Sequence, residues 1–349
     1  MITPNSSPRN PATLQTTLNQ LPPSHRRVLT DGLRAPSAHN AQPWRLEWVS
    51  APDSRDELVD PAAAQWFALH YDHNDYLPHD PDDRDAFLCM GALVETIVLA
   101  GVRHQVTVDV VDVFERSGSD LHVLDVVLRA TPESFSEQER RWAELASDRH
   151  TNRSKYTAEA LPVELTDELT SLGCSFVSPD QLSDLVDEAS KLSWNDRRFV
   201  ADLERYCHSE VSAPRGMTAN GLMLTRYEWA FLQGAFSLGK LPGWLGRVFS
   251  ARDVRLMRTA PAVAVLGADS LNPKDLVEAG RRLLRCWSLV SGTGWAYHPI
   301  SISVDRPETA PRVAALSGIP VPAAVFRIGR PSAPASRSNR VQLIDVFQE

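Results

Sequence analysis

The feature that most constrains the fold is a turn built into residues 34–45, Arg-Ala-Pro-Ser-Ala-His-Asn-Ala-Gln-Pro-Trp-Arg. Its two prolines and its asparagine break helices, so the segment predicts the end of a helix, a turn and the start of a strand. The turn brings together the hydroxyl of Ser37 and the carboxamides of Asn40 and Gln42. Such groups both donate and accept, which suits the edge of a planar heterocycle with alternating carbonyl and N–H groups. A surface turn with locally satisfied polar groups is the other interpretation, and these residues alone leave both open.

Hydrophobic periodicity predicts a similar order of helices and strands in the two parts of the chain. In the first part we expect a helix ending near residue 34, strands at 44–49 and 65–71, a long helix capped by Asp82 or Asp83 and running through Leu99, and strands at 106–113 and 121–128. In the second part we expect helices at 137–147, 165–172, 182–192 and 275–291, and strands at 262–266 and 323–328. Residues 195–258 have few strand signals and many aromatics, which predicts either a mobile lid or helices packed on the core.

Composition excludes several classes of protein. With 349 residues, 43% apolar and 23% charged, the chain is typical of a globular protein of one large or two ordinary domains. A net charge of -8 disfavours a nucleic-acid partner. The four cysteines have no paired spacing, the N-terminus lacks the apolar core of a signal peptide, and 18 apolar residues never run uninterrupted. We therefore expect a cytoplasmic protein without disulfides or a membrane span.

A second cluster, residues 149–156, combines two guanidiniums with a hydroxyl. Arg149 and Arg153 are four residues apart with Thr151 between them, so the three side chains can converge on one phosphate. A solvated basic loop after an acidic helix is the alternative interpretation.

Both segments resemble motifs of the nitroreductase family. The first is similar to the family's Pro-Ser-x-x-Asn-x-Gln-Pro-Trp, with every fixed position present, and the resemblance implies flavin contacts for Pro36, Ser37, Asn40 and Gln42. The second is similar to the family's Arg-Arg-Ser-x-Arg-x-Phe, which holds the FMN phosphate. It implies that role for Arg149, Thr151 and Arg153, with His150 where a second arginine is common.

Two further segments resemble parts of the same family less closely. A basic residue after the last strand commonly reaches the phosphate, which implies that role for Arg337 or Arg340. The family's Pro-x-Glu-Gly, whose backbone N–H groups face the flavin, corresponds here to Pro299, Ile300, Ser301 and Ile302. Glu and Gly are both missing, so a backbone contact would survive while redox tuning and substrate access would differ.

The motifs are divided between the two parts of the chain, and each part has only some of them. This division resembles the fused, tandem (Acg-like) branch of the nitroreductase family. It implies an α+β nitroreductase-like fold with mixed sheets flanked by helices, in two pseudo-symmetric halves. We place the halves at 1–135 and 136–349, the second with a possible lid at 195–258, and expect a monomer that is an internal pseudo-dimer with one FMN.

The expected function is that of an FMN-dependent oxidoreductase acting on a small molecule. Reduction driven by NAD(P)H and flavin-mediated dehydrogenation are both open, and the alternative is a protein that sequesters FMN without turnover. No catalytic residue is assigned. The two His and five Asp of segment 71–83 could bind a divalent metal, but the Asp residues are interpreted as groups that cap the following helix, and no metal is expected.

Overall fold

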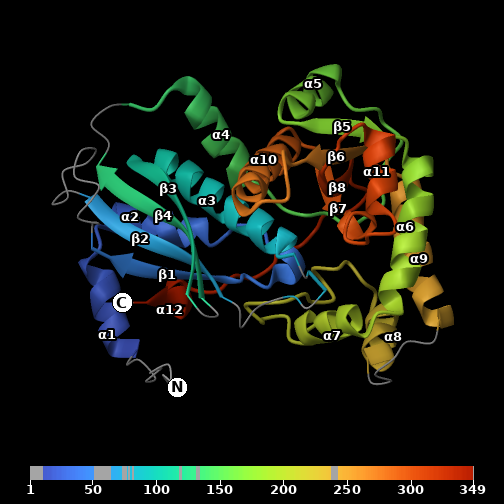
Figure 1. The fold of residues 1–349 in the computed structure, drawn as a ribbon, viewed down its shortest axis with the longest axis horizontal. Coiled ribbons are helices and arrows are strands. Elements are labelled where there is room, and N and C mark those ends of the chain that lie inside the picture. Colours follow the sequence, from blue (N-terminus) through green and yellow to red (C-terminus); the bar gives the residue numbers. More distant parts are fainter. Residues whose placement is uncertain are drawn as a thin grey trace.

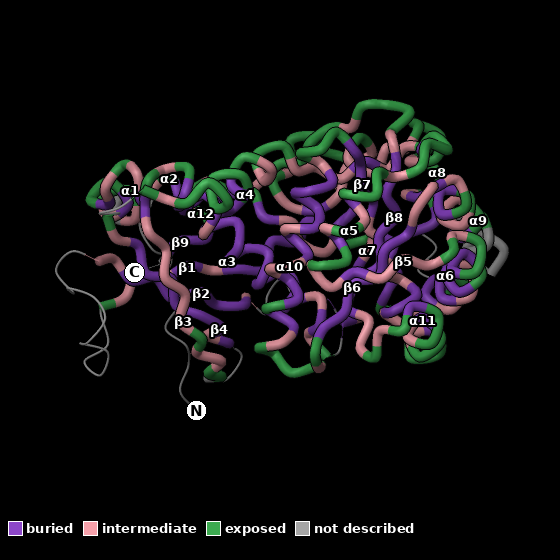
Figure 2. The backbone as a smooth tube through the Cα atoms, turned by 90° about the horizontal axis from the view of Figure 1, so that it is seen from above, coloured by how far each residue is buried: buried purple, intermediate pink, exposed green. Residues whose placement is uncertain are grey.

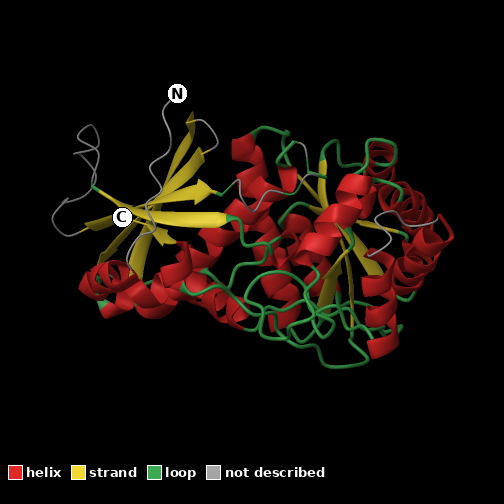
Figure 3. Cartoon of the chain, turned by 90° about the horizontal axis from the view of Figure 1, so that it is seen from below, coloured by secondary structure: helices red, strands yellow, loops and turns green. Residues whose placement is uncertain are grey.

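The computed structural model describes residues 11–50, 64–72, 77, 79–80, 82–117, 120–130, 134–236 and 243–348. In this part of the chain two β-sheets lie at opposite ends of the molecule, with helices packed between and around them (Figures 1 and 3). The expected α+β class is confirmed.

The first sheet has the strand order β3-β4-β2-β1-β9. Its strands are β1 (Trp44–Val49), β2 (Ala64–Tyr71), β3 (Val106–Ser117), β4 (Asp120–Ala130) and β9 (Phe347–Gln348). All neighbours are antiparallel except β9, which is parallel to β1 and makes the sheet mixed. Side chains alternate along β1, where Trp44 and Leu46 are buried and Arg45 and Glu47 are partly exposed. The four strands predicted in the first part of the chain are confirmed.

The second sheet has the order β5-β6-β8-β7 and is antiparallel throughout. It contains β5 (Cys174–Val177), β6 (Ala262–Gly267), β7 (Ala296–Pro299) and β8 (Pro322–Gly329). The strands predicted at 262–266 and 323–328 are confirmed. The sequence did not predict β5 and β7, each only four residues long.

The two sheets share one topology. The order β3-β4-β2-β1 in the first corresponds, strand for strand along the chain, to β7-β8-β6-β5 in the second. In each half a long helix follows the second strand: α3 (Arg84–His104) after β2 and α10 (Pro273–Gly292) after β6. The chain therefore repeats one arrangement, as the similar order of elements predicted.

Helices α3 and α10 pack on each other in the middle of the molecule, where the backbone is largely buried (Figure 2). A Cβ atom on Gly91 of α3 would lie 1.9 Å from the carbonyl oxygen of Val277, and one on Gly280 of α10 would lie 2.2 Å from that of Leu88. Each helix thus uses a glycine to bring its backbone against the other. By length and apolarity α3 could cross a membrane, but 89% of its most apolar window is buried inside the protein.

The N-terminus of α3 corrects one prediction. Asp83 is the N-cap residue, but its φ of 53° turns its side chain away from the helix N–H groups, and Asp82 lies one residue further out. The capping carboxylate belongs to Asp80, which accepts hydrogen bonds from the N–H groups of Asp85 (2.9 Å) and Ala86 (3.2 Å).

The remaining helices cover the sheets. The predicted helix at 137–147 is confirmed with the same bounds, and its N-cap Ser136 forms a capping box with Glu139. These helices are α1 (Pro11–Gln20), α2 (Pro23–Gly32), α4 (Glu137–Ser147), α5 (Val163–Ser171), α11 (Ala310–Ser317) and α12 (Leu343–Val346).

The second half has an insertion between β5 and β6 that the first half lacks. It consists of α6 (Pro179–Trp194), α7 (Arg197–Tyr206), α8 (Arg226–Phe236) and α9 (Gly243–Arg258). After β8 the chain returns to the first half, where α12 and β9 pack against β1. The C-terminal segment therefore connects the two halves.

Candidate functional site

The turn between α2 and β1 adopts an uncommon backbone conformation. His39, Asn40 and Gln42 have φ angles of 50°, 55° and 54°, in the left-handed region that residues other than glycine seldom adopt. Strain of this kind costs about 1–3 kcal/mol per residue and persists only where neighbouring contacts impose it. One such contact is the hydrogen bond from the N–H of Gln42 to Ser37 Oγ (2.9 Å).

A cavity of about 320 Å³ opens beside this turn, and we call it the cationic cavity. Its lining comes mainly from three segments that are far apart in sequence: residues 34–40, 149–153 and 336–340. Its lining residues are Arg34, Pro36, Ser37, His39, Asn40, Arg149, His150, Thr151, Arg153, Met217, Gly221, Ser336, Arg337, Ser338 and Arg340. The structure thus brings together the residues of both predicted motifs except Gln42.

Arg153 faces the cationic cavity without a carboxylate partner among the described residues. Its Nη1 donates to the carbonyl oxygen of Gly221 (2.8 Å), and its backbone N–H donates to the sulfur of Met223 (3.2 Å). Burial lowers the pKa of its guanidinium to about 10. The charge is therefore held where an anion would stabilise it.

Arg340, in the C-terminal segment, lines the same cavity. Its Nη1 donates to Asn40 Oδ1 (2.9 Å) and to the carbonyl oxygen of Asn339 (2.9 Å). Its Nε is buried with no hydrogen-bond partner among the described residues, and burial together with the charge of Arg149 lowers its pKa to about 9. Asn40 also donates to the carbonyl oxygen of Gly216 (3.0 Å), so its amide holds Arg340 in place and is fully used within the protein.

Arg149 is anchored on the second sheet. It donates from Nη1 to the hydroxyl of Tyr297 (2.8 Å) and from Nη2 to the carbonyl oxygen of Arg34 (2.9 Å). Tyr297 also forms an isolated β-bridge with Thr151 and stacks on Trp287 at 4.7 Å. These contacts fix the start of the second half against the turn of the first.

Gln42 and Arg337 differ from the other predicted residues. Gln42 lines neither cavity, because its buried amide donates to the carbonyl oxygen of Pro214 (2.7 Å) and accepts from the N–H of Val341 (3.0 Å). These two hydrogen bonds connect the turn to residues 214 and 341. Arg337 lines the rim, is exposed, and pairs with Asp148 at 3.3 Å.

A second cavity of about 370 Å³ adjoins the first, and we call it the apolar chamber. Pro36, Ser37, His39, Thr151, Arg153 and Met217 line both cavities, so the two lie side by side. Most of its other walls come from α3, α10 and the insertion: Leu88, Cys89, Ala92, Trp194, Phe199, Leu203, Cys207, Leu222, Leu224, Leu232, Leu283 and Trp287.

Pro299, Ile300 and Ser301 line the apolar chamber and not the cationic cavity. The N–H of Ile300 donates to the carbonyl oxygen of Val325 (2.8 Å) and is not available to a ligand. Ser301 Oγ accepts from the N–H of Val325 (3.1 Å). Only the N–H groups from Ser301 onward, where the short helix η3 (Ser301–Ser303) begins, could serve the backbone role implied by the resemblance.

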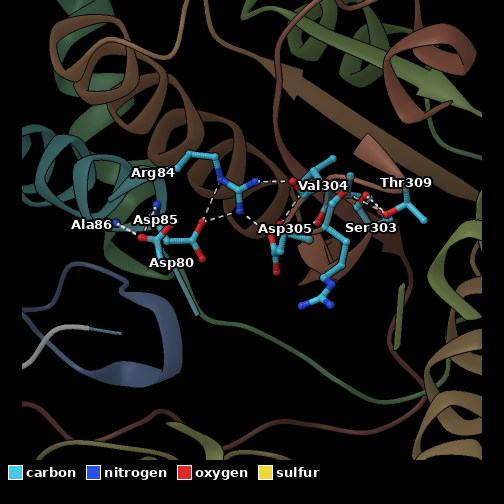
Figure 4. Close-up of polar contacts among 11 residues, drawn as sticks. Asp80, Arg84, Asp85, Ala86, Ser303, Val304, Asp305 and Thr309 are labelled. Carbon is cyan, nitrogen blue, oxygen red and sulfur yellow. Dashed lines mark hydrogen bonds and ion pairs between the residues drawn. The ribbon is translucent and has the colours of Figure 1, made fainter. Parts of the chain in front are cut away.

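A buried ionic network forms one side of this chamber (Figure 4). Arg84, at the start of α3, donates to Asp85 Oδ1 (2.8 Å) and to the carbonyl oxygen of Val304 (2.7 Å), and it pairs with Asp305. Burial would lower the pKa of Arg84, but the charges of Asp85 and Asp305 outweigh it and the pKa is raised. Burial raises the pKa of Asp305 to about 6 despite that pairing.

The sequence left the histidines of the chamber unassigned. His39, His79 and His298 line it, and the rings of His39 and His79 stack at a centroid distance of 5.4 Å. His39 occupies a variable position of the first motif, and His79 lies in the segment considered only as a capping run. Among the described residues no group of three His, Cys, Asp or Glu side chains is arranged to hold a metal.

Neither a family model nor a curated protein sequence matches the chain. Among solved structures, a protein described as a nitroreductase from Anabaena variabilis is similar, with a TM-score of 0.46 and 10% identity over 91% of each chain. The FMN-dependent nitroreductase NfnB from Mycobacterium smegmatis, solved in complex with NADPH, has a TM-score of 0.38 and 18% identity, over 60% of this chain and 98% of its own.

The FMN- and NADPH-dependent nitroreductase NfnB from Sphigopyxis sp. strain HMH has a TM-score of 0.35 and 17% identity, over the same shares. All three TM-scores lie below 0.5, so the function proposed next rests on this chain's own residues.

Proposed function

We propose that the chain is an FMN-dependent oxidoreductase of the nitroreductase type. The phosphate of FMN would bind in the cationic cavity, and the flavin ring would extend toward the apolar chamber. One observation carries the proposal: a cavity in which Arg153 and Arg340 have no carboxylate partner among the described residues adjoins an apolar chamber of about 370 Å³. A ligand with a phosphate at one end and a planar apolar group at the other matches that pair of environments.

The donors of the cationic cavity fit a phosphate. Arg153 and Arg340 carry charges that burial destabilises, and a dianion would offset that penalty through charge-assisted hydrogen bonds. The unpartnered Nε of Arg340 is an additional donor. Thr151, which lines both cavities, offers a hydroxyl at the same place.

The apolar chamber fits a flavin ring and a small substrate. Pro36 and Ser37 lie where the two cavities join, as the resemblance implies for residues beside the ring. Bound FMN would supply two-electron transfer, with NAD(P)H as donor or a small metabolite as reductant. The residues of the chain would bind the phosphate, orient the ring and exclude water.

We further propose that the chain is a tandem pseudo-dimer with halves at 1–135 and 136–349, holding one FMN and remaining a monomer. The repeated strand order and the reciprocal glycine contacts of α3 and α10 support this division. The four cysteines are free and buried, which suits the cytoplasm.

Residues 195–258 would act as a cover for the chamber. They form α7, α8 and α9, and side chains from this segment line the chamber, including Phe199, Leu203 and Leu232. The three helices agree with the interpretation of helices packed on the core, and packed helices can also open as a lid. Residues 237–242 of the expected lid lie outside the described part of the chain.

The proposal is tested by the visible spectrum of the purified protein, the mass of its released flavin and the molar mass in solution from light scattering. We expect one FMN per monomeric chain. A protein that takes up no FMN on reconstitution would contradict the cofactor, two FMN per chain would contradict the single site, and a stable dimer would contradict only the monomer.

Sequestration of FMN without turnover is the second candidate. It is favoured by one observation: the N–H of Ile300, which the resemblance implied for the flavin, is used by Val325. Anaerobic stopped-flow mixing with NADH or NADPH separates the two functions. Rapid bleaching of the flavin absorbance supports the oxidoreductase, and an unchanged spectrum with either donor supports sequestration.

A further inference from the structure

The apolar chamber contains a histidine whose ring is fixed by a carboxylate. His79 Nδ1 is hydrogen-bonded to Asp202 Oδ2, and the backbone N–H of His79 donates to the same oxygen (3.0 Å). Asp202 is only 1% exposed, so the pair is held in the protein interior. The Nε2 of His79 makes no hydrogen bond to the described residues and is the nitrogen left for a ligand.

A second histidine stacks on the first. The rings of His39 and His79 are inclined by 22°, and His39 also meets the ring of Tyr206 edge-on at 6.1 Å. The Nδ1 of His39 is buried without a partner among the described residues, and its φ of 50° is one of the strained angles of the turn. Because His39 lines both cavities, the stacked pair lies where they meet.

The two histidines titrate in opposite directions. Burial lowers the pKa of His79, but the hydrogen bond to Asp202 and the charges of Asp305 and Asp85 outweigh it, so the pKa is raised. Burial and the charge of His79 lower the pKa of His39 to about 4. Near neutral pH, His39 is therefore uncharged while His79 can still carry a proton. Paired groups with divergent pKa values are typical of sites that transfer protons.

The chain contains a comparable array that lines neither of these two cavities. In the first sheet His122 Nε2 contacts Asp125 Oδ1 at 2.7 Å, and His122 stacks on His70 at 4.8 Å. Neither histidine lines the cationic cavity or the apolar chamber. A stacked histidine pair with an aspartate can thus be purely structural, and the array at His79 differs from it by facing the chamber.

We propose that His79, positioned by Asp202, is the proton donor of the apolar chamber and hydrogen-bonds the acceptor oxygen of a planar, otherwise apolar substrate. The inference rests on the proposed function, because it assigns the chamber to the substrate. The imidazolium donates a hydrogen bond from Nε2 to an anionic oxygen of the ligand. Where that oxygen is more basic than the imidazole, the proton moves to it and leaves neutral imidazole and a neutral hydroxyl; a less basic oxygen, such as that of 4-nitrophenolate, stays anionic and is held as an ion pair. His79 regains its proton from solvent. His39 stacks on the ring of His79 and holds it facing the chamber.

Equilibrium binding to the oxidised protein, without a reductant, tests this proposal independently of turnover. The probes are 4-nitrophenol, which ionises and changes its absorbance, and its methyl ether 4-nitroanisole, which cannot ionise. At a pH just below the pKa of the free phenol, we expect the bound phenol to show the phenolate spectrum. His79→Gln should weaken binding of the phenolate about tenfold or more and change binding of the ether less than about twofold.

Two further variants complete the design. His122→Gln removes the comparable structural pair and should leave both affinities unchanged. Asp202→Asn keeps His79 but removes the charge that raises its pKa, so the preference for the phenolate should disappear at a lower pH than in the unmodified protein. This variant also tests the proposal if His79→Gln does not fold.

Several results would overturn the proposal: equal phenolate affinity in His79→Gln and the unmodified protein, equal losses for both probes, or no binding of either probe. Flavin content is measured first on the same sample. Flavin with no preference for the phenolate refutes the role of His79 alone. If the protein binds no FMN but still prefers the phenolate in a way that depends on His79, the cofactor is refuted and the role of His79 is supported.

Discussion

Two groups of arginines in this molecule have opposite electrostatic environments. Between the halves, Arg281 and Arg285 of α10 contact the fully buried Glu95 of α3 at 2.9 and 2.6 Å. The charge of Glu95 outweighs burial and raises the pKa of Arg281. In the cationic cavity, the hydrogen bonds that Arg153 and Arg340 make to described residues go to neutral oxygen and sulfur acceptors, and burial lowers the pKa of both.

The difference shows which charges the fold neutralises by itself. A buried cation without a counter-charge is unfavourable, so a protein retains one where a ligand supplies the anion. The arginines between the halves are neutralised by Glu95 and stabilise the fold. Those of the cavity would gain their counter-charge from a bound anion. Substitutions in the two groups should therefore have opposite consequences for stability and for binding.

The largest effect is expected at Glu95. Glu95→Gln leaves Arg281 and Arg285 without their counter-charge between α3 and α10, and removing one partner of a buried ion pair costs about 3–5 kcal/mol. We expect the lower end of that range, because both arginines are partly exposed. Urea denaturation measures the change. Glu168→Gln, which breaks the exposed pair with Arg141, is the control and should change the free energy of unfolding by less than about 1 kcal/mol.

Arg153→Ala should have the reverse pattern. Loss of a charge-assisted contact with the phosphate should weaken FMN binding by about 1.5–3 kcal/mol, roughly 10- to 100-fold in Kd. The free energy of unfolding of the flavin-free protein should change by less than about 1 kcal/mol, because only the hydrogen bond to Gly221 is lost. Flavin fluorescence quenching and urea denaturation measure the two quantities. A strongly destabilised protein with unchanged FMN affinity would place Arg153 with the structural arginines.

Asn40 should act on FMN through Arg340. Asn40→Ala removes the oxygen that accepts from Arg340 Nη1, so we expect a smaller loss than at Arg153, about 0.5–1.5 kcal/mol. The losses from Asn40→Ala and Arg340→Ala should not add, with a coupling energy of about 1 kcal/mol in a double-mutant cycle. The pair Asn40 and Arg153, which share no hydrogen bond, is the control and should be additive. Additivity in both cycles would mean that Asn40 contacts the ligand directly.

The sequence predicted the elements whose signals are local. The turn follows from its prolines and asparagine, and the strands of the first sheet from their alternation. The long helix α3 was predicted, and so was capping by the aspartates of segment 71–83, but the sequence named Asp82 or Asp83 where Asp80 accepts from the helix N–H groups. Short strands such as β5 and β7 contain only four residues each, too few for the alternation of apolar and polar side chains to be recognised.

The site was predicted in its residue types more fully than in their contacts. The arginines and the turn were found as motifs, but the partners of Asn40 at Gly216 and Arg340 are 176 and 300 residues away in the chain. No local pattern encodes such contacts. The same limit applies to His79, whose partner Asp202 lies in a helix of the insertion.

The smallest effect is expected at Arg337. This arginine is exposed at the rim of the cationic cavity, whereas Arg340, three residues later, lies deeper in it. Arg337 pairs with Asp148 at 3.3 Å in an exposed position, and such pairs contribute about 0–1 kcal/mol. Arg337→Gln should therefore weaken FMN binding less than about threefold. Salt should reduce even this effect, because an exposed charge is screened within about 10 Å at moderate ionic strength. Flavin titrations at low and high salt measure it, with Arg153→Ala as the reference. A loss at Arg337 equal to that at Arg153 would place the phosphate at the rim instead of beside the buried arginines.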